Sequence, residues 1–239
     1  MRISNRARER VKRIPRGLFF ILLVLSIGAV IALVNSAQVV QVGTIQGSST
    51  HVVIRPIGAG DHVNGNPNAP VQIFVYSDPE CPYCKYFELS IVPQLQHQYG
   101  NSIVFIYRHF LLPFRTKSPT ETVALECAAE LGGNNFFFKY LDALFTATPS
   151  NNKLDLSTLT PLAMSMGLAA PFTQVQFDAC RASAAPKLHV DVDQAEAKKA
   201  GMSITPTIVL RNHNSEIVIP GAYYGKMTAA IDVLLGKQQ

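Results

Sequence analysis

The sequence has 239 residues, 48% of them hydrophobic and 15% charged, with a formal net charge of +5 at pH 7. That length and apolar content suffice for one globular domain with additional segments. Residues 1–16 hold seven of the 21 Lys and Arg residues and one acid, so the remainder of the chain is close to neutral. A near-neutral remainder argues against a nucleic-acid-binding surface, and we expect no nucleic-acid partner.

Residues 17–34, GLFFILLVLSIGAVIALV, form an apolar stretch without a charge. In a helix this stretch approaches the length needed to cross a bilayer, and the basic residues before it favour a cytoplasmic N-terminus. We predict a basic cytoplasmic tail over 1–16, a transmembrane anchor or signal segment over 17–37, and a linker over 38–67. The rest of the chain is then extracytoplasmic, in the periplasm or at the cell surface. Whether the segment is cleaved stays open, although VNSA at 34–37 is a poor cleavage site.

The first half of the domain follows a strand–helix–strand pattern. A short strand is expected at 51–55, and the apolar run VQIFVY at 71–76 predicts a buried strand. Helical spacing of apolar residues starts at Pro82, with a kink expected at Pro93. A second buried strand is predicted at 102–107. Successive strands joined by a helix indicate a right-handed unit with parallel strands.

A block of helices follows. Ser118-Pro119-Thr120-Glu121 has the pattern of a capping box with Pro at the first helical position, and Gly132-Gly133 ends the helix that it starts. Further helices are expected over 136–145, 155–167, 171–182 and 186–201. The chain then returns to strands in a hairpin over 204–210 and 216–219, and a helix over 226–235 closes it.

Cys81-Pro82-Tyr83-Cys84 lies where the buried strand ends and the helix begins. There the free N–H groups and the positive end of the helix favour a thiolate at Cys81, which we expect to be exposed and nucleophilic. Pro82 suits the first helical turn. Cys84, one turn deeper, is expected to be the resolving thiol that closes a Cys81–Cys84 disulfide.

Three alternatives explain the cysteine pair less well than a redox centre does: a metal site, a haem attachment and a structural disulfide. A structural zinc site needs about four ligands, and His97 and His109 lie at arbitrary spacings from the pair. A haem attachment requires His where Lys85 stands. A purely structural disulfide gives little stabilisation in so tight a loop. We therefore expect a redox centre, with no metal and no organic cofactor.

The order of these motifs resembles the thioredoxin fold. A strand, CPYC at a helix start, a second strand and a distant Ile-Thr-Pro-Thr lie in that order, and the helical block resembles DsbA-like thiol–disulfide oxidoreductases. The resemblance covers residues 68–237, with the helical insertion at about 115–200. It implies an α/β thioredoxin fold with an inserted helical domain. It also implies that Pro206 is cis and packs against CPYC, and that Thr205 offers backbone groups to a substrate.

The sequence departs from the family pattern beside the redox centre. Many members carry a buried acid six residues before the first cysteine, where this chain has Val75. Asp78 and Glu80 are nearer and are expected to be exposed loop acids. Tyr83 replaces the His of the best-known oxidase, which leaves the oxidising strength of the centre open.

Cys127 and Cys180 lie on two predicted helices of the insertion, 53 positions apart. Some DsbA-like proteins carry a structural disulfide here, and an oxidising compartment permits one. We favour a bridge between the two, with a pair of buried thiols as the alternative. His189 and His213 are expected at the surface.

These observations predict an extracytoplasmic thiol–disulfide oxidoreductase. We favour a dithiol oxidase, with a disulfide reductase or isomerase as the alternative. A non-catalytic chaperone or binding module on a thioredoxin scaffold is the second alternative. The expected partners are exported cysteine-containing proteins. The resemblance also implies a quinone-linked membrane partner of the DsbB or vitamin-K-epoxide-reductase (VKOR) type.

Overall fold

The computed structural model describes residues 52–166 and 171–237. The predicted tail at 1–16, the transmembrane or signal segment at 17–37 and the linker as far as residue 51 lie outside the described residues. Within the described ranges, no helix combines the length and the apolar character needed to cross a membrane.

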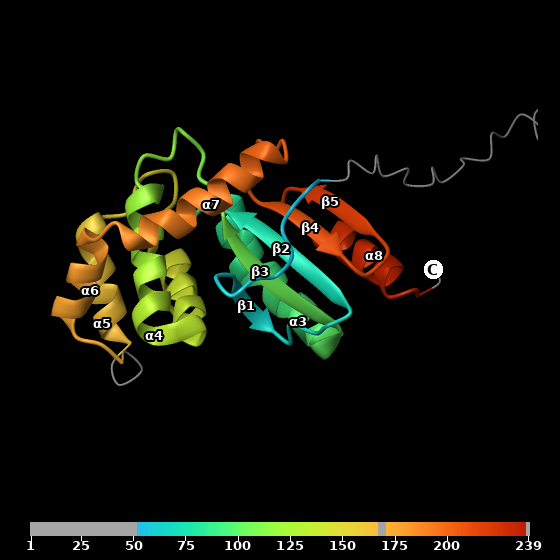
Figure 1. The fold of residues 1–239 in the computed structure, drawn as a ribbon, viewed down its shortest axis with the longest axis horizontal. Helices are drawn as coiled ribbons and strands as arrows, with labels where there is room; N and C mark the ends of the chain where they lie inside the picture. Colours follow the sequence, from blue (N-terminus) through green and yellow to red (C-terminus); the bar gives the residue numbers. More distant parts are fainter. Residues whose placement is uncertain (1–51, 167–170, 238–239) are drawn as a thin grey trace, which may run out of the picture. The chain divides into compact units, whose positions relative to one another are not determined.

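A five-stranded sheet in the order β1-β3-β2-β4-β5 forms the centre of the fold (Figure 1). Its central strands β2 and β3 are parallel, with Val71 opposite Ile103, and every other neighbouring pair is antiparallel. The predicted strand–helix–strand unit and the C-terminal hairpin are therefore correct. The strands are β1 (His62–Gly65), β2 (Val71–Ser77), β3 (Ile103–His109), β4 (Thr207–Arg211) and β5 (Glu216–Pro220).

The strand expected at 51–55 is wrong over its described part. Residues 52–55 form no strand, and the edge partner of β3 is β1, within the segment interpreted as a linker. Side chains hold the earlier segment instead: the Val52 amide donates to Glu216 Oε1, and the Arg55 amide donates to Glu196 Oε2.

The helix after β2 contains a change of pitch. It runs as α2 (Pro82–Tyr86), a π-helical turn η1 (Phe87–Ile91) and α3 (Val92–Tyr99), before the short 3₁₀ turn η2 (Gly100–Ser102). Pro93 lacks the N–H that an α-helix would need at that point, so the wider turn falls just before it. The disturbance expected at Pro93 thus takes the form of a π turn.

The helical insertion lies between β3 and β4, as predicted. Two helices expected on either side of Gly132-Gly133 form one element, α4, interrupted where Gly133 adopts a positive φ of 76°. Glycine tolerates this conformation because it has no Cβ. The insertion consists of α4 (Ser118–Ala147), η3 (Leu156–Thr158), α5 (Leu159–Ser165), α6 (Gln174–Ala182) and α7 (Ala185–Lys199).

Three apolar clusters hold these parts together. Alternate residues of β2 point to opposite faces of the sheet, so Ile73 packs with α3 and the C-terminal helix α8 (Tyr224–Leu234), whereas Phe74 packs with the end of α7. The third cluster fills the insertion and includes Cys81 and Cys84. The sheet–insertion boundary is therefore where the CPYC pair lies, and Figure 1 shows α4, α5 and α6 grouped at one side of the strands.

Candidate active site

The CPYC segment begins a helix, as expected. Cys81 is the N-cap, with extended φ and ψ of −86° and 120°, and Pro82 occupies the first helical turn. The Lys85 amide donates to the Cys81 carbonyl at 3.0 Å, which is the first bond of the helix. Pro82 loses nothing here because the first N–H groups of a helix have no partner within it.

The distant Thr205-Pro206 loop lies against Cys81. The peptide bond between Thr205 and Pro206 is cis, and Cys81 Sγ lies 3.3 Å from the Thr205 carbonyl oxygen. Gly221 secures the loop, since its amide donates to the Pro206 carbonyl at 2.8 Å. The structure thus brings together residues that are 124 positions apart in the sequence.

The exposure expected for Cys81 is wrong. Its residue is 2% exposed, close to the 1% of Cys84, whereas Tyr83 between them is 67% exposed. Cys81 is covered because its sulfur packs against the buried Thr205-Pro206 loop. Its sulfur therefore lies beside residue 206, as the resemblance implied, but below the surface.

The two thiols differ in acidity. A hydrogen bond from Cys84 is the largest influence on Cys81; burial opposes it, and the Thr205 side chain and the amides of Cys84 and Tyr83 add to it. Together they lower the pKa of Cys81 to about 5. Burial and the neighbouring Cys81 raise the pKa of Cys84 well above its usual range. The Thr205 hydroxyl is buried without another partner among the described residues, so it is free to donate to a Cys81 thiolate.

The neighbouring thiol lowers the pKa of Cys81 more than the helix start does. Backbone amides at the helix start contribute to the acidity of Cys81, but the second thiol contributes more. One cysteine therefore stabilises the anion of the other, as a nucleophile and resolving partner require.

Asp78 and Glu80 are not exposed loop acids, which corrects the expectation from sequence. Both are fully buried. Asp78 accepts from the Ser118 hydroxyl at 2.5 Å and from the Leu112 amide at 3.0 Å, and its own amide lies 3.5 Å from Cys84 Sγ. Their burial follows from the insertion, which covers this loop.

Glu121 completes the buried acid group. It was expected to cap a helix, but α4 begins after Lys117 without a side-chain cap, and Ser118 turns to Asp78 instead. Burial, reinforced by Glu80 and Asp78, raises the pKa of Glu121 to about 9, so it holds a proton at neutral pH. The sequence contained no signal for this group beyond its clustered acids, because the fold brings the loop after β2 and the start of α4 together.

A disulfide joins Cys127 on α4 to Cys180 on α6, with Cα atoms 5.8 Å apart. It is the bridge that we favoured from the sequence. Cys81 and Cys84 are the free cysteines. The four cysteines therefore divide into a structural pair within the insertion and a reduced pair at its boundary with the sheet.

Comparison with known proteins agrees with this geometry. Residues 58–232 match the family model described as thioredoxin. The Na(+)/H(+) antiporter NhaA 1 of Mycobacterium sp. (strain KMS) is 27% identical over 158 residues, which cover 65% of this chain and 24% of the antiporter. The chain thus spans about a quarter of the length of such curated relatives.

Two solved structures share the fold. BdbD from Bacillus subtilis, in its oxidised form, has a TM-score of 0.67 at 22% identity, over 77% of this chain and 98% of BdbD. The alpha-DsbA1 protein of Wolbachia pipientis has a TM-score of 0.64 at 22% identity, over 80% of this chain and 97% of that protein. The chain therefore has the DsbA-like form of this fold, a mixed α/β domain with a helical insertion.

Proposed function

This chain belongs to the thioredoxin family, and we propose that it is an extracytoplasmic thiol–disulfide oxidoreductase that works through Cys81 and Cys84. The observation that carries the proposal is the position of Cys81 Sγ, 3.3 Å from the carbonyl of Thr205 beside a cis proline. A lowered pKa at this thiol and a raised one at Cys84 support an asymmetric pair.

In the oxidising direction, a substrate thiolate attacks Cys81 Sγ of the Cys81–Cys84 disulfide. The bond between the two cysteines breaks, a mixed disulfide forms, and Cys84 leaves with the electron pair and takes up a proton. A second substrate thiolate then attacks the substrate sulfur, and Cys81 leaves as a thiolate. The substrate loses two electrons, and the enzyme gains them.

The acidity of Cys81 supports the oxidase direction. A thiol with a pKa of about 5 is a good leaving group at neutral pH, and a stabilised thiolate makes the reduced enzyme the favoured state. The disulfide form is then a ready electron acceptor. Exported cysteine-containing proteins are the proposed substrates, and a quinone-linked membrane oxidase of the DsbB or VKOR type is the proposed source of reoxidation.

Two alternative functions can be distinguished from an oxidase by measurement. A reductase or isomerase uses the same thiols with electrons supplied to the site, and a binding module retains the fold without exchange. The match to the antiporters gives no support for a transport function, because it spans 24% of their length. Titration of the reduction potential separates the three: a relatively oxidising couple supports an oxidase, a strongly reducing one a reductase, and an unreactive pair a binding module.

Trapping of substrates tests the proposal directly. In cells that express Cys84→Ala, Cys81 has no resolving partner, so mixed disulfides with exported proteins should accumulate and disappear on reduction. The matched control is the double variant Cys81→Ala/Cys84→Ala, which should trap nothing. Equal trapping by the two variants would show that Cys81 is not the exchanging thiol.

A further inference from the structure

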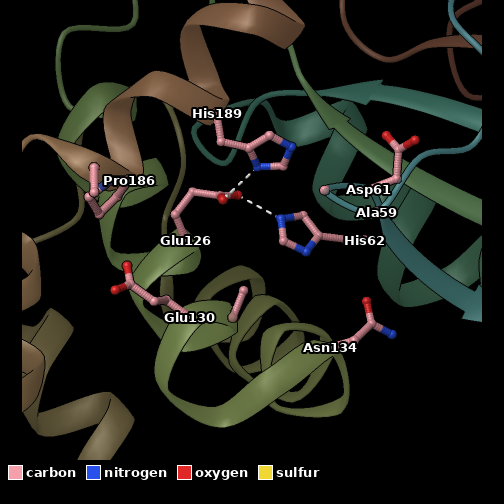
Figure 2. Close-up of a pocket in the computed structure, with 11 residues that line it drawn as sticks. Ala59, Asp61, His62, Glu126, Glu130, Asn134, Pro186 and His189 are labelled. Carbon is pink, nitrogen blue, oxygen red and sulfur yellow. Dashed lines mark hydrogen bonds and ion pairs between the residues drawn. The ribbon is translucent and has the colours of Figure 1, made fainter.

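A second group of side chains lies in a cavity of about 370 Å³ lined by the sheet edge and the insertion (Figure 2). Three elements contribute to it: His62 lies on β1, Glu126 on α4 and His189 on α7. Figure 2 shows the three side chains pointing toward one another. Asp61, Glu130 and Asn134 add polar atoms to the wall of the cavity.

Short contacts join the three side chains. His62 Nε2 lies 2.7 Å from Glu126 Oε1, and His189 Nδ1 lies 2.6 Å from Glu126 Oε2. One nitrogen of each imidazole and an oxygen of the carboxylate all lie within 4.8 Å of one another. A single ion placed among them would reach all three with small side-chain movements, because zinc bonds nitrogen and oxygen ligands at about 2.0–2.2 Å.

Three imidazoles surround the buried Glu126 carboxylate. His62 and His189 contact its two oxygens, and the residue is 7% exposed. His109 is fully buried on β3, and its Nε2 lies 2.6 Å from Glu126 Oε1. His109 therefore fixes the orientation of the Glu126 carboxylate, as residues that hydrogen-bond to metal ligands do in proteins.

We propose that His62, Glu126 and His189 form a binding site for a divalent transition metal ion of the zinc class. Two imidazole nitrogens and one carboxylate oxygen suit zinc and its neighbours, whereas calcium and magnesium prefer oxygen ligands throughout. The cavity leaves room for water as a fourth ligand. To bind the ion, each imidazole turns the lone pair of this ring nitrogen to the metal, and the proton shared with Glu126 moves to its other ring nitrogen or is released to water.

The site would join the sheet edge to two helices of the insertion. An ion that binds the folded protein and not the unfolded chain stabilises the fold in proportion to its affinity. The proposed ligands lie 64 and 63 positions apart, so none of the short spacings typical of zinc motifs is present. We expected no metal from the sequence for this reason.

Metal binding to the full-length chain in detergent tests the inference. The chain is stripped with a chelator and kept oxidised at Cys81–Cys84, so that no free thiol competes. Titration with Zn²⁺ should give one ion per chain, and a raised melting temperature that a chelator reverses. Co²⁺ should give visible bands of a nitrogen–oxygen site without thiolate charge-transfer absorption.

Three variants locate the ion. His62→Gln and His189→Gln should each weaken Zn²⁺ binding at least tenfold, whereas His97→Gln, which alters an exposed residue on α3, should leave it unchanged. Circular dichroism checks that each variant is folded, and the Co²⁺ spectrum of the unaltered chain gives evidence that does not depend on any variant. Absence of one-to-one binding, a thiolate band with Co²⁺, or an affinity unchanged in both His variants would overturn the inference. None of these results bears on disulfide exchange at Cys81.

Discussion

At the residue scale, the environment of each sulfur decides what the two central thiols do. Cys81 lies beside the Thr205 carbonyl, and its thiolate is stabilised by the thiol of Cys84, the Thr205 side chain and nearby backbone amides. Cys84 accepts from the Ser77 side chain and the Asp78 amide, but burial and the neighbouring Cys81 outweigh them and raise its pKa. Two identical side chains three positions apart therefore differ in acidity because hydrogen bonds outweigh burial at Cys81, whereas burial outweighs hydrogen bonds at Cys84.

The alkylation rate of Cys81 should depend on pH as expected for an acidic thiol. With a pKa of about 5, its rate of reaction with iodoacetamide should reach half its maximum near pH 5. Cys84→Ala should move this midpoint upward, because it removes the largest stabilising hydrogen bond. Thr205→Val should move it upward by less. The measurement is the pH dependence of the alkylation rate, followed by mass spectrometry of the labelled peptide.

A midpoint between pH 8 and 9 in the unaltered chain would contradict the arrangement. Cys127 and Cys180 provide an internal control, because their disulfide should leave both unlabelled at every pH.

At the scale of elements, the disulfide ties α6 to α4 within the insertion. The bridge closes a loop of 53 positions. A cross-link of this span limits the freedom of the unfolded chain much more than the short CPYC loop does. Its expected contribution is therefore to stability, whereas Cys81 and Cys84 are the pair proposed to exchange disulfides.

The double variant Cys127→Ala/Cys180→Ala should lose about 4 kcal/mol of unfolding free energy, from the loop-closure relation for this span. Urea unfolding of the oxidised unaltered chain and of the double variant measures the difference. The alkylation midpoint of Cys81 should stay the same, because the groups that shift its pKa belong to Cys84, Thr205 and Tyr83 and not to the bridge. An equal urea midpoint in the two proteins would mean that the bridge does not stabilise the fold.

At the scale of the whole molecule, burial of acids between the sheet and the insertion makes stability depend on pH. Glu88 on η1 is 8% exposed, and burial, with a smaller effect from Asp142, raises its pKa from 4.5 to about 8. Between these values the unfolded chain has released a proton that the folded protein keeps. The free energy of unfolding therefore falls as pH rises through this range.

Glu88→Gln should remove the share of this dependence that comes from Glu88, while Glu121, whose pKa is raised to about 9, keeps its own share. The variant should be more stable than the unaltered chain at pH 7, by up to about 3 kcal/mol, and the advantage should vanish near pH 4. Urea unfolding between pH 4 and 8, in the oxidised form so that Cys81 does not titrate, measures it. Glu130→Gln, at an exposed position on α4, is the matched control. A stability difference that is the same at every pH would rule out the buried charge as its cause.

The local elements of this fold were predictable because local patterns specify them. The apolar run of β2 predicted a buried strand, Pro82 predicted a helix start, and the hairpin of β4 and β5 followed from its polar turn. The order of CPYC, helical block and Thr205-Pro206 identified the fold and placed the cis proline, since these motifs lie in a recognisable sequence.

Contacts between distant segments decided the remainder. Asp78 and Glu80 looked like solvated loop acids, and His189 looked like a surface residue, but the insertion buries the first two and brings the third to Glu126. The depth of Cys81 likewise depends on a loop 124 positions away. The sequence alone determined most of the strands and helices and the redox motif, because neighbouring residues set those preferences, but it missed the edge strand β1, which depends on pairing with β3. Only the tertiary structure decided burial, acidity and the histidine–glutamate cluster, because each depends on side chains that approach from separate elements.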